Sequence, residues 1–141
     1  SLAEERGLRF SFYPANLREA HPNTAVLEVR DAAGRTLTLQ AASTGGGRIR
    51  VDRLNGVDVS FTGMFNTLVV QHQDIAGKVA DVTRALSSAK INIANMSVCR
   101  DRRGGDALMV IETDQKVPPV VRVLIGELRG IRSLTYYEKE E

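Results

Sequence analysis

The second half of the chain alternates between two hydrophobic periodicities, in the order strand, helix, strand, strand, helix, strand. Apolar residues recur every three or four positions in the expected helices, and they form short runs or alternate in the expected strands. The expected elements cover residues 66–71, 76–89, 90–100, 106–113, 117–128 and 131–137, followed by a charged tail at residues 138–141. Two interleaved strand–helix–strand units of this kind form a four-stranded antiparallel sheet with both helices on one face.

Residues 63–141 are therefore expected to form a ferredoxin-like βαββαβ domain, which places the chain in the α+β class. Such a sheet has two edge strands, and edge strands must be covered or paired to avoid uncontrolled association. Side-by-side pairing of two sheets is one solution. The pattern therefore predicts a homodimer or a larger assembly through these sheets.

Residues 1–62 are expected to form a separate, mostly β domain. Short strands are predicted at residues 9–13, 24–30, 35–42, 48–54 and 57–61, and one or two helical turns are predicted at residues 14–20. Five short strands with little helix make a thin domain. Because the chain also starts at Ser1 without Met, this domain is expected to be the second half of a larger one.

Composition excludes several classes of protein. Apolar residues make up 43% of the chain, but no run of 18 apolar residues exists, so no transmembrane helix is expected. The 19 basic and 17 acidic residues are intermixed and Trp is absent, which is not the pattern of a nucleic-acid-binding surface. A single cysteine, Cys99, excludes an internal disulfide framework and a Cys-rich metal site, and it favours a cytoplasmic protein.

The loop after the first strand of the second domain has the sequence HQDIAG at residues 72–77 and opens a helix. The first amides of a helix lack partners and the helix dipole favours negative charge there, so a ligand carboxylate is well received. Gly77 removes a side chain that would block its approach. Asp74 either caps the helix or meets a ligand ammonium group. His72 is more typical of a partly buried strand histidine than of a ligand.

A second polar segment, NIAN at residues 92–95, starts the next strand. If the two strands are neighbours, the loop and this segment are expected to meet at one end of the sheet. Asn92 offers both a donor and an acceptor, whereas Asn95 faces either the same place or the opposite one. The predicted site for a small zwitterion consists of Asp74, Ile75, Ala76, Gly77, Asn92 and Asn95. Turn formation by Asn92 and helix packing at Gly77 are the alternatives.

The first domain contains a glycine-rich stretch, STGGG at residues 43–47, between two expected strands. Its backbone amides suit an anion, with help from Arg48 or Arg50, but no helix follows it as in phosphate-binding fingerprints. A tight turn or a β-bulge is the alternative. Together with the HPN segment at residues 21–23, the stretch predicts a second anion or substrate site formed by His21, Asn23, Ser43, Gly45, Gly46 and Gly47.

The stretch LVVQHQDIAGKV at residues 68–79, with INIANM at residues 91–96, resembles the ACT domain, a small regulatory module that binds amino acids. In such domains the strand-to-helix loop and the start of the second strand hold the effector, often across a dimer interface. The resemblance implies side-chain contacts from Asp74 and Asn92 and backbone contacts from Ile75, Ala76 and Gly77. Many relatives have proline where Ala76 stands, so a less rigid loop is expected here.

Three elements before this module, HPNT at residues 21–24, STGGG at 43–47 and LNG at 54–56, resemble the β chain of bacterial iron–sulfur L-serine dehydratases. In that family an allosteric substrate-binding domain precedes the ACT domain. The resemblance implies that residues 1–62 are a truncated domain of that kind and that the chain senses an amino acid, with L-serine the leading ligand. The C-terminal region of a D-3-phosphoglycerate dehydrogenase, or an ACT module with a purely oligomerising role, is the alternative.

No catalytic groups are identified in the chain. It has no recognisable pair of nucleophile and base, and it lacks the three cysteines that would hold an iron–sulfur cluster. No metal or cofactor is expected in it. In the family that it resembles, L-serine is converted to pyruvate and ammonia on an α chain that holds a [4Fe-4S] cluster. The resemblance therefore implies a catalytic α subunit as partner, beside a second copy of this chain.

Overall fold

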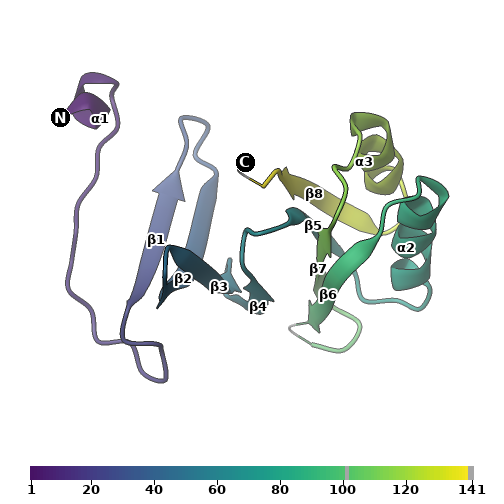
Figure 1. Ribbon diagram of the computed structural model, residues 1–141, viewed down its shortest axis with the longest axis horizontal. Coiled ribbons are helices and arrows are strands. Elements are labelled where there is room, and N and C mark those ends of the chain that lie inside the picture. The colour runs from purple at the N-terminus through teal and green to yellow at the C-terminus, as the bar shows by residue number, and fades with distance from the viewer. Residues whose placement is uncertain (101, 140–141) are drawn as a thin grey trace.

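The computed structural model describes residues 1–100 and 102–139, which form two antiparallel four-stranded sheets and three helices (Figure 1). In chain order the elements are α1 (Leu2–Glu5), β1 (Thr24–Arg30), β2 (Thr36–Gly45), β3 (Arg48–Leu54), β4 (Val57–Phe61), β5 (Asn66–Gln73), α2 (Lys78–Ser88), β6 (Ile93–Arg100), β7 (Asp106–Thr113), α3 (Pro119–Gly126) and β8 (Ile131–Tyr137). This is the α+β class that the sequence predicts. Of the predicted tail at residues 138–141, Glu140 and Glu141 lie outside the described residues.

The C-terminal sheet has the strand order β6-β7-β5-β8, with α2 and α3 on one face (Figure 1). β5 and β6 both pair antiparallel with β7, so they run parallel to each other, and α2 is the crossover between them. β8 pairs antiparallel with β5 at the other side. The ferredoxin-like prediction is confirmed.

The face of this sheet that packs against the helices is formed by alternate, apolar residues of its strands. Leu68 and Val70 of β5 point to the same face and are fully buried, and Val82 and Leu86 lie on one side of α2. The core consists of Leu68, Val70, Val82, Leu86, Ile91, Met109, Ile111, Val117, Val121 and Ile125. Burying a side chain of this size contributes about 1.5–3 kcal/mol, so this cluster is the main source of stability in the second half.

The opposite face of the same sheet is covered by the first sheet, whose strand order is β1-β2-β3-β4. The shared cluster consists of Val51, Leu54, Val59, Phe61, Val69 and Val110. Because β5 and β7 are covered on both faces, their sequences are continuous apolar runs rather than alternating ones. β1 lies at the far edge of the first sheet in Figure 1, and its Val26, Leu27 and Val29 are exposed. The predicted division after residue 62 stays a prediction.

The segment before β1 differs from two predictions. Residues 9–13 were expected to be a strand, but they pair with no described strand, and Phe10, Phe12 and Tyr13 are exposed. An alternating pattern forms a strand only where a neighbour accepts its hydrogen bonds. The helical turns expected at residues 14–20 do not form, and only a tight turn at residues 18–19 is present, because so short a segment between two prolines does not repay helix nucleation.

Two element boundaries differ because of left-handed residues. Gly77 has a φ of 91°, so α2 starts at Lys78 rather than near residue 76. Lys90 has a φ of 58° and turns the chain, so β6 starts at Ile93 rather than at residue 90. α2, with 11 residues, is the longest helix in the described part of the chain, and neither it nor the other two described helices are long and apolar enough to cross a bilayer.

Candidate functional site

The loop between β5 and α2 is hydrogen-bonded to two neighbouring turns, the one before β7 and the one before β8. The Asp74 amide donates to the Gly105 carbonyl oxygen at 2.9 Å, and the Gln73 amide donates to the Gly130 carbonyl oxygen at 2.8 Å. Gly77 then enters the helix, and no side chain caps it. The first amides of α2 are therefore open to an acceptor from outside the helix, as the binding of a carboxylate requires.

Asp74 does not cap the helix, so that alternative is wrong. Its Oδ2 accepts hydrogen bonds from the Gly104 amide at 3.0 Å and from Arg100 Nη1 at 3.1 Å. The Gly104 amide, and after it the Arg100 guanidinium, hold the pKa of this carboxyl below its usual value of 3.8. The loop therefore carries a fixed negative charge. Arg100 already pairs with that charge, so an ammonium group bound here would share the carboxylate with the guanidinium.

His72, near the end of β5 and just before the loop, is more buried than the sequence predicts, with 2% of its surface exposed. Nδ1 lies 2.9 Å from the Gln73 carbonyl oxygen and donates to it, since a carbonyl oxygen can only accept. Nε2 is buried and has no hydrogen-bond partner among the described residues. This ring nitrogen is therefore a polar atom that the fold closes off from solvent without giving it a protein partner in the described part of the chain.

Lys78 supports the loop from behind, and the sequence reasoning missed it. Its Nζ donates to the Arg129 carbonyl oxygen at 2.7 Å and to Asp81 Oδ2 at 2.6 Å, with 9% of the side chain exposed. This contact ties the start of α2 to the turn before β8. The sequence feature that could have identified Lys78 is its place directly after Gly77, at a helix start where the dipole does not favour positive charge. Ile75, by contrast, is exposed at the loop.

Asn92 lies at the other end of the sheet. Its amide N–H donates to Gln115 Oε1 at 2.7 Å, and its side-chain Nδ2 donates to Asp114 Oδ2 at 2.6 Å. The register pairs Gln73 with Asp106 at one end of β7 and Ile93 with Thr113 at the other. At roughly 3.3 Å per residue along β7, the two ends are on the order of 20 Å apart.

The expectation that the loop and the Asn92 segment meet at one end of the sheet is therefore wrong within one chain. β5 and β6 run parallel, so the end of β5 and the start of β6 must lie at opposite ends. The crossover helix α2 carries the chain back along the length of the sheet. The expectation depended on the two strands being neighbours, but β7 lies between β5 and β6, and the parallel direction of these two strands was overlooked.

Asn95 is separated from both groups. Its Nδ2 donates at 3.0 Å to Oε2 of Glu112, a residue that also accepts from the Thr62 amide. This places Asn95 with the first sheet, on the face of the C-terminal sheet that lacks helices. The side-chain contact leaves it outside a site around Asp74 or Asn92.

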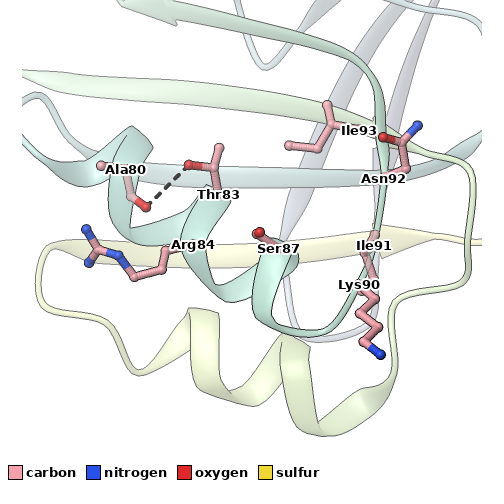
Figure 2. A pocket seen from close by; sticks show the side chains of 8 residues that line it. All are labelled: Ala80, Thr83, Arg84, Ser87, Lys90, Ile91, Asn92 and Ile93. Atoms are coloured by element: carbon pink, nitrogen blue, oxygen red, sulfur yellow. Dashed lines mark hydrogen bonds between the residues drawn. The ribbon is translucent and has the colours of Figure 1, made fainter.

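An open groove lies beside Asn92, between α2 and the start of β6 (Figure 2). Figure 2 shows Thr83, Arg84 and Ser87 along one side of the helix, with Asn92 and Ile93 across from them. The lining residues are Ala80, Thr83, Arg84, Ser87, Lys90, Ile91, Asn92 and Ile93. The sequence reasoning missed the helix side of this groove. Its signal was a row of small residues, Ala80, Thr83 and Ser87, on the face of α2 away from the core.

The second predicted site does come together at one end of the first sheet. The Ser43 amide donates to the Asn23 carbonyl oxygen at 2.9 Å, and the Asn23 amide donates to His21 Nδ1 at 3.2 Å. Gly45, Gly46 and Gly47 have φ values of 90°, 62° and 74° and make the turn between β2 and β3. The three glycines thus form the tight turn that was the alternative to an anion cradle.

A polar pocket adjoins His21, between residues 16–21 and the middle strands of the first sheet. It includes two arginines, Arg50 and Arg53, but Arg50 pairs with Asp52 and Arg53 pairs with Asp58. The positive charge that an anion would need is therefore already compensated. Neither arginine therefore strengthens the prediction of an anion site here.

The topology, the uncapped loop and the edge strand together define a known class of module. Residues 66–125 match the family model of the ACT domain, so this part of the chain is an ACT domain. Over 134 residues, or 95% of its length, the chain is 34% identical to the probable L-serine dehydratase beta chain of Bacillus subtilis. It is 23% identical to the L-serine dehydratase beta chain of Peptoniphilus asaccharolyticus over 135 residues, again 95% of its length.

These matches confirm the resemblance to L-serine dehydratase beta chains. The chain spans 60% of the length of each of these two relatives. It is also 31% identical to the D-3-phosphoglycerate dehydrogenase of Bacillus subtilis over 138 residues, covering 90% of this chain and 26% of that protein. The similarity thus extends across both sheets in either kind of relative.

Proposed function

We propose that the chain is the regulatory part of an L-serine dehydratase and that its ACT domains bind an amino acid, L-serine being the leading ligand, between two copies. The similarity to two beta chains over 95% of the chain supports this assignment. The conversion of L-serine to pyruvate and ammonia takes place on a partner α chain with its [4Fe-4S] cluster. Cys99 is the single cysteine here, and one thiolate does not fit such a cluster.

The observation that carries the proposal is the position of the two half-sites along β6. β6 is an edge strand of the ACT sheet. Asn92 stands directly before its first residue, and Arg100, its last residue, is bonded to Asp74. When two β6 strands pair antiparallel about a two-fold axis, the start of one strand lies beside the end of the other. Asn92 of one copy then faces the Asp74 loop of its partner, twice per dimer.

Each group at this joint site matches one part of an amino acid. The first amides of α2 after Gly77 receive the carboxylate, and the Asp74 carboxylate receives the ammonium group. The amide oxygen of Asn92 is an acceptor for the remaining donors of the ligand. Because both copies contribute, ligand binding favours one arrangement of the two modules, which changes the activity of the catalytic chain.

Titration calorimetry of the chain with L-serine, glycine and other amino acids tests the proposal. L-serine is expected to release heat, and Asp74→Ala and Asn92→Ala should each weaken binding by about 1–3 kcal/mol, the scale for an unpaired polar partner. Ser97→Ala, on the same edge strand, is the control, because the Ser97 hydroxyl has no partner among the described residues. No heat with any amino acid would exclude the sensor function.

A mixing experiment tests the joint site itself. In a heterodimer of the Asp74→Ala and Asn92→Ala chains, one site carries both changes and the other carries neither. Free exchange in a 1:1 mixture makes heterodimers about half of all dimers, so mixing the two weakened variants is expected to restore about a quarter of the wild-type number of sites at wild-type affinity. A site within one chain predicts no recovery.

A second candidate is the regulatory end of a D-3-phosphoglycerate dehydrogenase, favoured by the 31% identity to such an enzyme. Assays of the full-length protein separate the two candidates. L-serine deamination supports the first, and NAD-dependent oxidation of 3-phosphoglycerate supports the second. Dimerisation without any ligand binding would favour a purely oligomerising role.

A further inference from the structure

Glu112 is a buried carboxylate that joins the two halves of the chain. It lies on β7, on the face of the ACT sheet that packs against the first sheet, with 4% of its surface exposed. Oε1 accepts from the Thr62 amide at 3.2 Å and from the Thr62 hydroxyl at 3.5 Å, and Oε2 accepts from Asn95 Nδ2 at 3.0 Å. One carboxylate thus binds the segment between the sheets with one oxygen and the edge strand with the other.

The bond to Asn95 falls at an irregular point of the edge strand. The pairing of β6 with β7 shifts register between Ile93 and Asn95, and Asn95 is the first residue paired after the shift, opposite Glu112. Such bulges bend a strand and redirect the side chains next to them. Asn92 stands just before this bulge. The Asn95–Glu112 bond therefore holds the segment that follows Asn92, while Gln115 and Asp114 hold Asn92 itself.

The bond to Thr62 falls where the first sheet meets the ACT sheet. Phe61, the last residue of β4, packs with Val69 and Val110 of the ACT sheet, and Thr62 follows it directly. A buried carboxylate that loses one of its donors is left with a large desolvation cost. The two ends of Glu112 are therefore not independent, since loosening one changes the geometry available to the other.

We infer that Glu112 is a positioning residue that couples the bulge at the start of β6 to the junction at Thr62. This role rests on the proposed function. An amino acid bound at Asn92 would favour one geometry of the bulge, and Asn95 in the bulge is bonded to Glu112. Glu112 in turn accepts from the Thr62 amide, which follows β4. Ligand binding at the dimer edge would thus change the packing of the first sheet through two hydrogen bonds of Glu112. Coupling of this kind needs direct measurement rather than inspection of contacts.

Amide hydrogen exchange without any ligand tests the link. Asn95→Ala removes only the bond on the β6 side, yet exchange of the Thr62 amide is expected to become roughly tenfold faster, the effect of losing one charge-assisted bond. Ser97→Ala is the matched control on the same strand and face, and it should leave Thr62 unchanged. Asn95 is exposed, so its variant is expected to fold. Unaltered exchange at Thr62 in Asn95→Ala would overturn the inference.

A second arm adds saturating L-serine and follows exchange in residues 57–65. The ligand is expected to slow exchange there in the wild-type chain. In Glu112→Gln this slowing should be lost even when the L-serine concentration is raised until the variant is saturated, so that weaker binding is not mistaken for lost coupling. Slowing that persists in Glu112→Gln would contradict the coupling. Failure of L-serine to bind would instead reject the proposed function, and the ligand-free arm would still decide the link.

Discussion

Asp74 holds two parts of the ACT domain together through one carboxylate oxygen. Its backbone continues β5, while Oδ2 is bonded to Gly104 and Arg100, which flank the turn between β6 and β7. Both donors stabilise the charged form and lower the pKa of Asp74. The carboxylate is therefore charged over the whole neutral range, as a partner for an ammonium group must be. Its identity was predictable, whereas these partners lie about 30 residues away and were not.

The lowered pKa of Asp74 predicts when this attachment fails. A carboxyl whose pKa is lower in the folded than in the unfolded state adds stability above the unfolded value, and that stability is lost as pH falls through the folded value. The amide signal of Gly104 is therefore expected to stay constant from neutral pH downward and to shift with a midpoint below 3.8. Nuclear magnetic resonance spectra across this pH range measure it. Asp74→Asn should abolish the shift, and a midpoint above 3.8 would contradict the assignment.

At the scale of elements, two glycines near the end of α3 have opposite requirements. Gly126 is the last helical residue, and a Cβ there would meet no atom within 4 Å. Gly130, in the turn before β8, has a φ of 87°, and a Cβ there would lie 3.4 Å from Cδ of Lys78. Only Gly130 therefore needs to be glycine. The turn that it makes carries the carbonyl oxygens bonded to Lys78 and to the Gln73 amide.

Alanine substitutions are expected to separate the two positions. Gly126→Ala should raise the free energy of unfolding by about 0.5–1 kcal/mol, because it restricts the unfolded chain without strain. Gly130→Ala should lower it by about 1–2 kcal/mol, the cost of a left-handed conformation for a residue with a side chain. Urea denaturation of both variants measures the difference. Shifts of the same sign would show that the two backbone conformations are alike.

At the scale of the whole molecule, the ACT sheet is covered on both faces but open at its β6 edge. The helices cover one face and the first sheet covers the other. Val98, in the middle of β6, is 44% exposed although it lies in a well-packed domain. β1 is the comparable open edge of the first sheet, with Val29 50% exposed. The ACT sheet also ends at β8 and the first sheet also ends at β4, but the half-sites lie along the β6 edge.

Lysine substitutions test which edge forms the proposed dimer. Charged side chains on an edge strand oppose pairing with another strand. Val98→Lys is expected to convert the dimer to a monomer in sedimentation velocity measurements and to abolish L-serine binding with it. Val29→Lys, at a similarly exposed edge position of the other sheet, is the control and should leave both unchanged. Loss of the dimer in Val29→Lys alone would move the interface to the first sheet.

The sequence alone determined the elements whose patterns are local. Strands β1, β3, β4, β7 and β8 have the predicted bounds, because their alternation or apolar runs and their turn residues are set by neighbours in the chain. The order of elements also fixed the ferredoxin-like topology, since right-handed crossovers leave few alternatives. The same local patterns predicted a site at the loop of Asp74 and Gly77, which stays a prediction.

Only the tertiary structure decided how the half-sites are arranged. A strand pattern at residues 9–13 failed because pairing needs a neighbour that local sequence does not reveal. Asn92 and Asp74 lie at opposite ends of the sheet because β5 and β6 run parallel, and Asn95 turns to Glu112 on the other face. Residue types are written in the sequence, but the direction of a strand and the far ends of hydrogen bonds depend on segments distant along the chain. The packed sheets therefore settle which polar groups face one another.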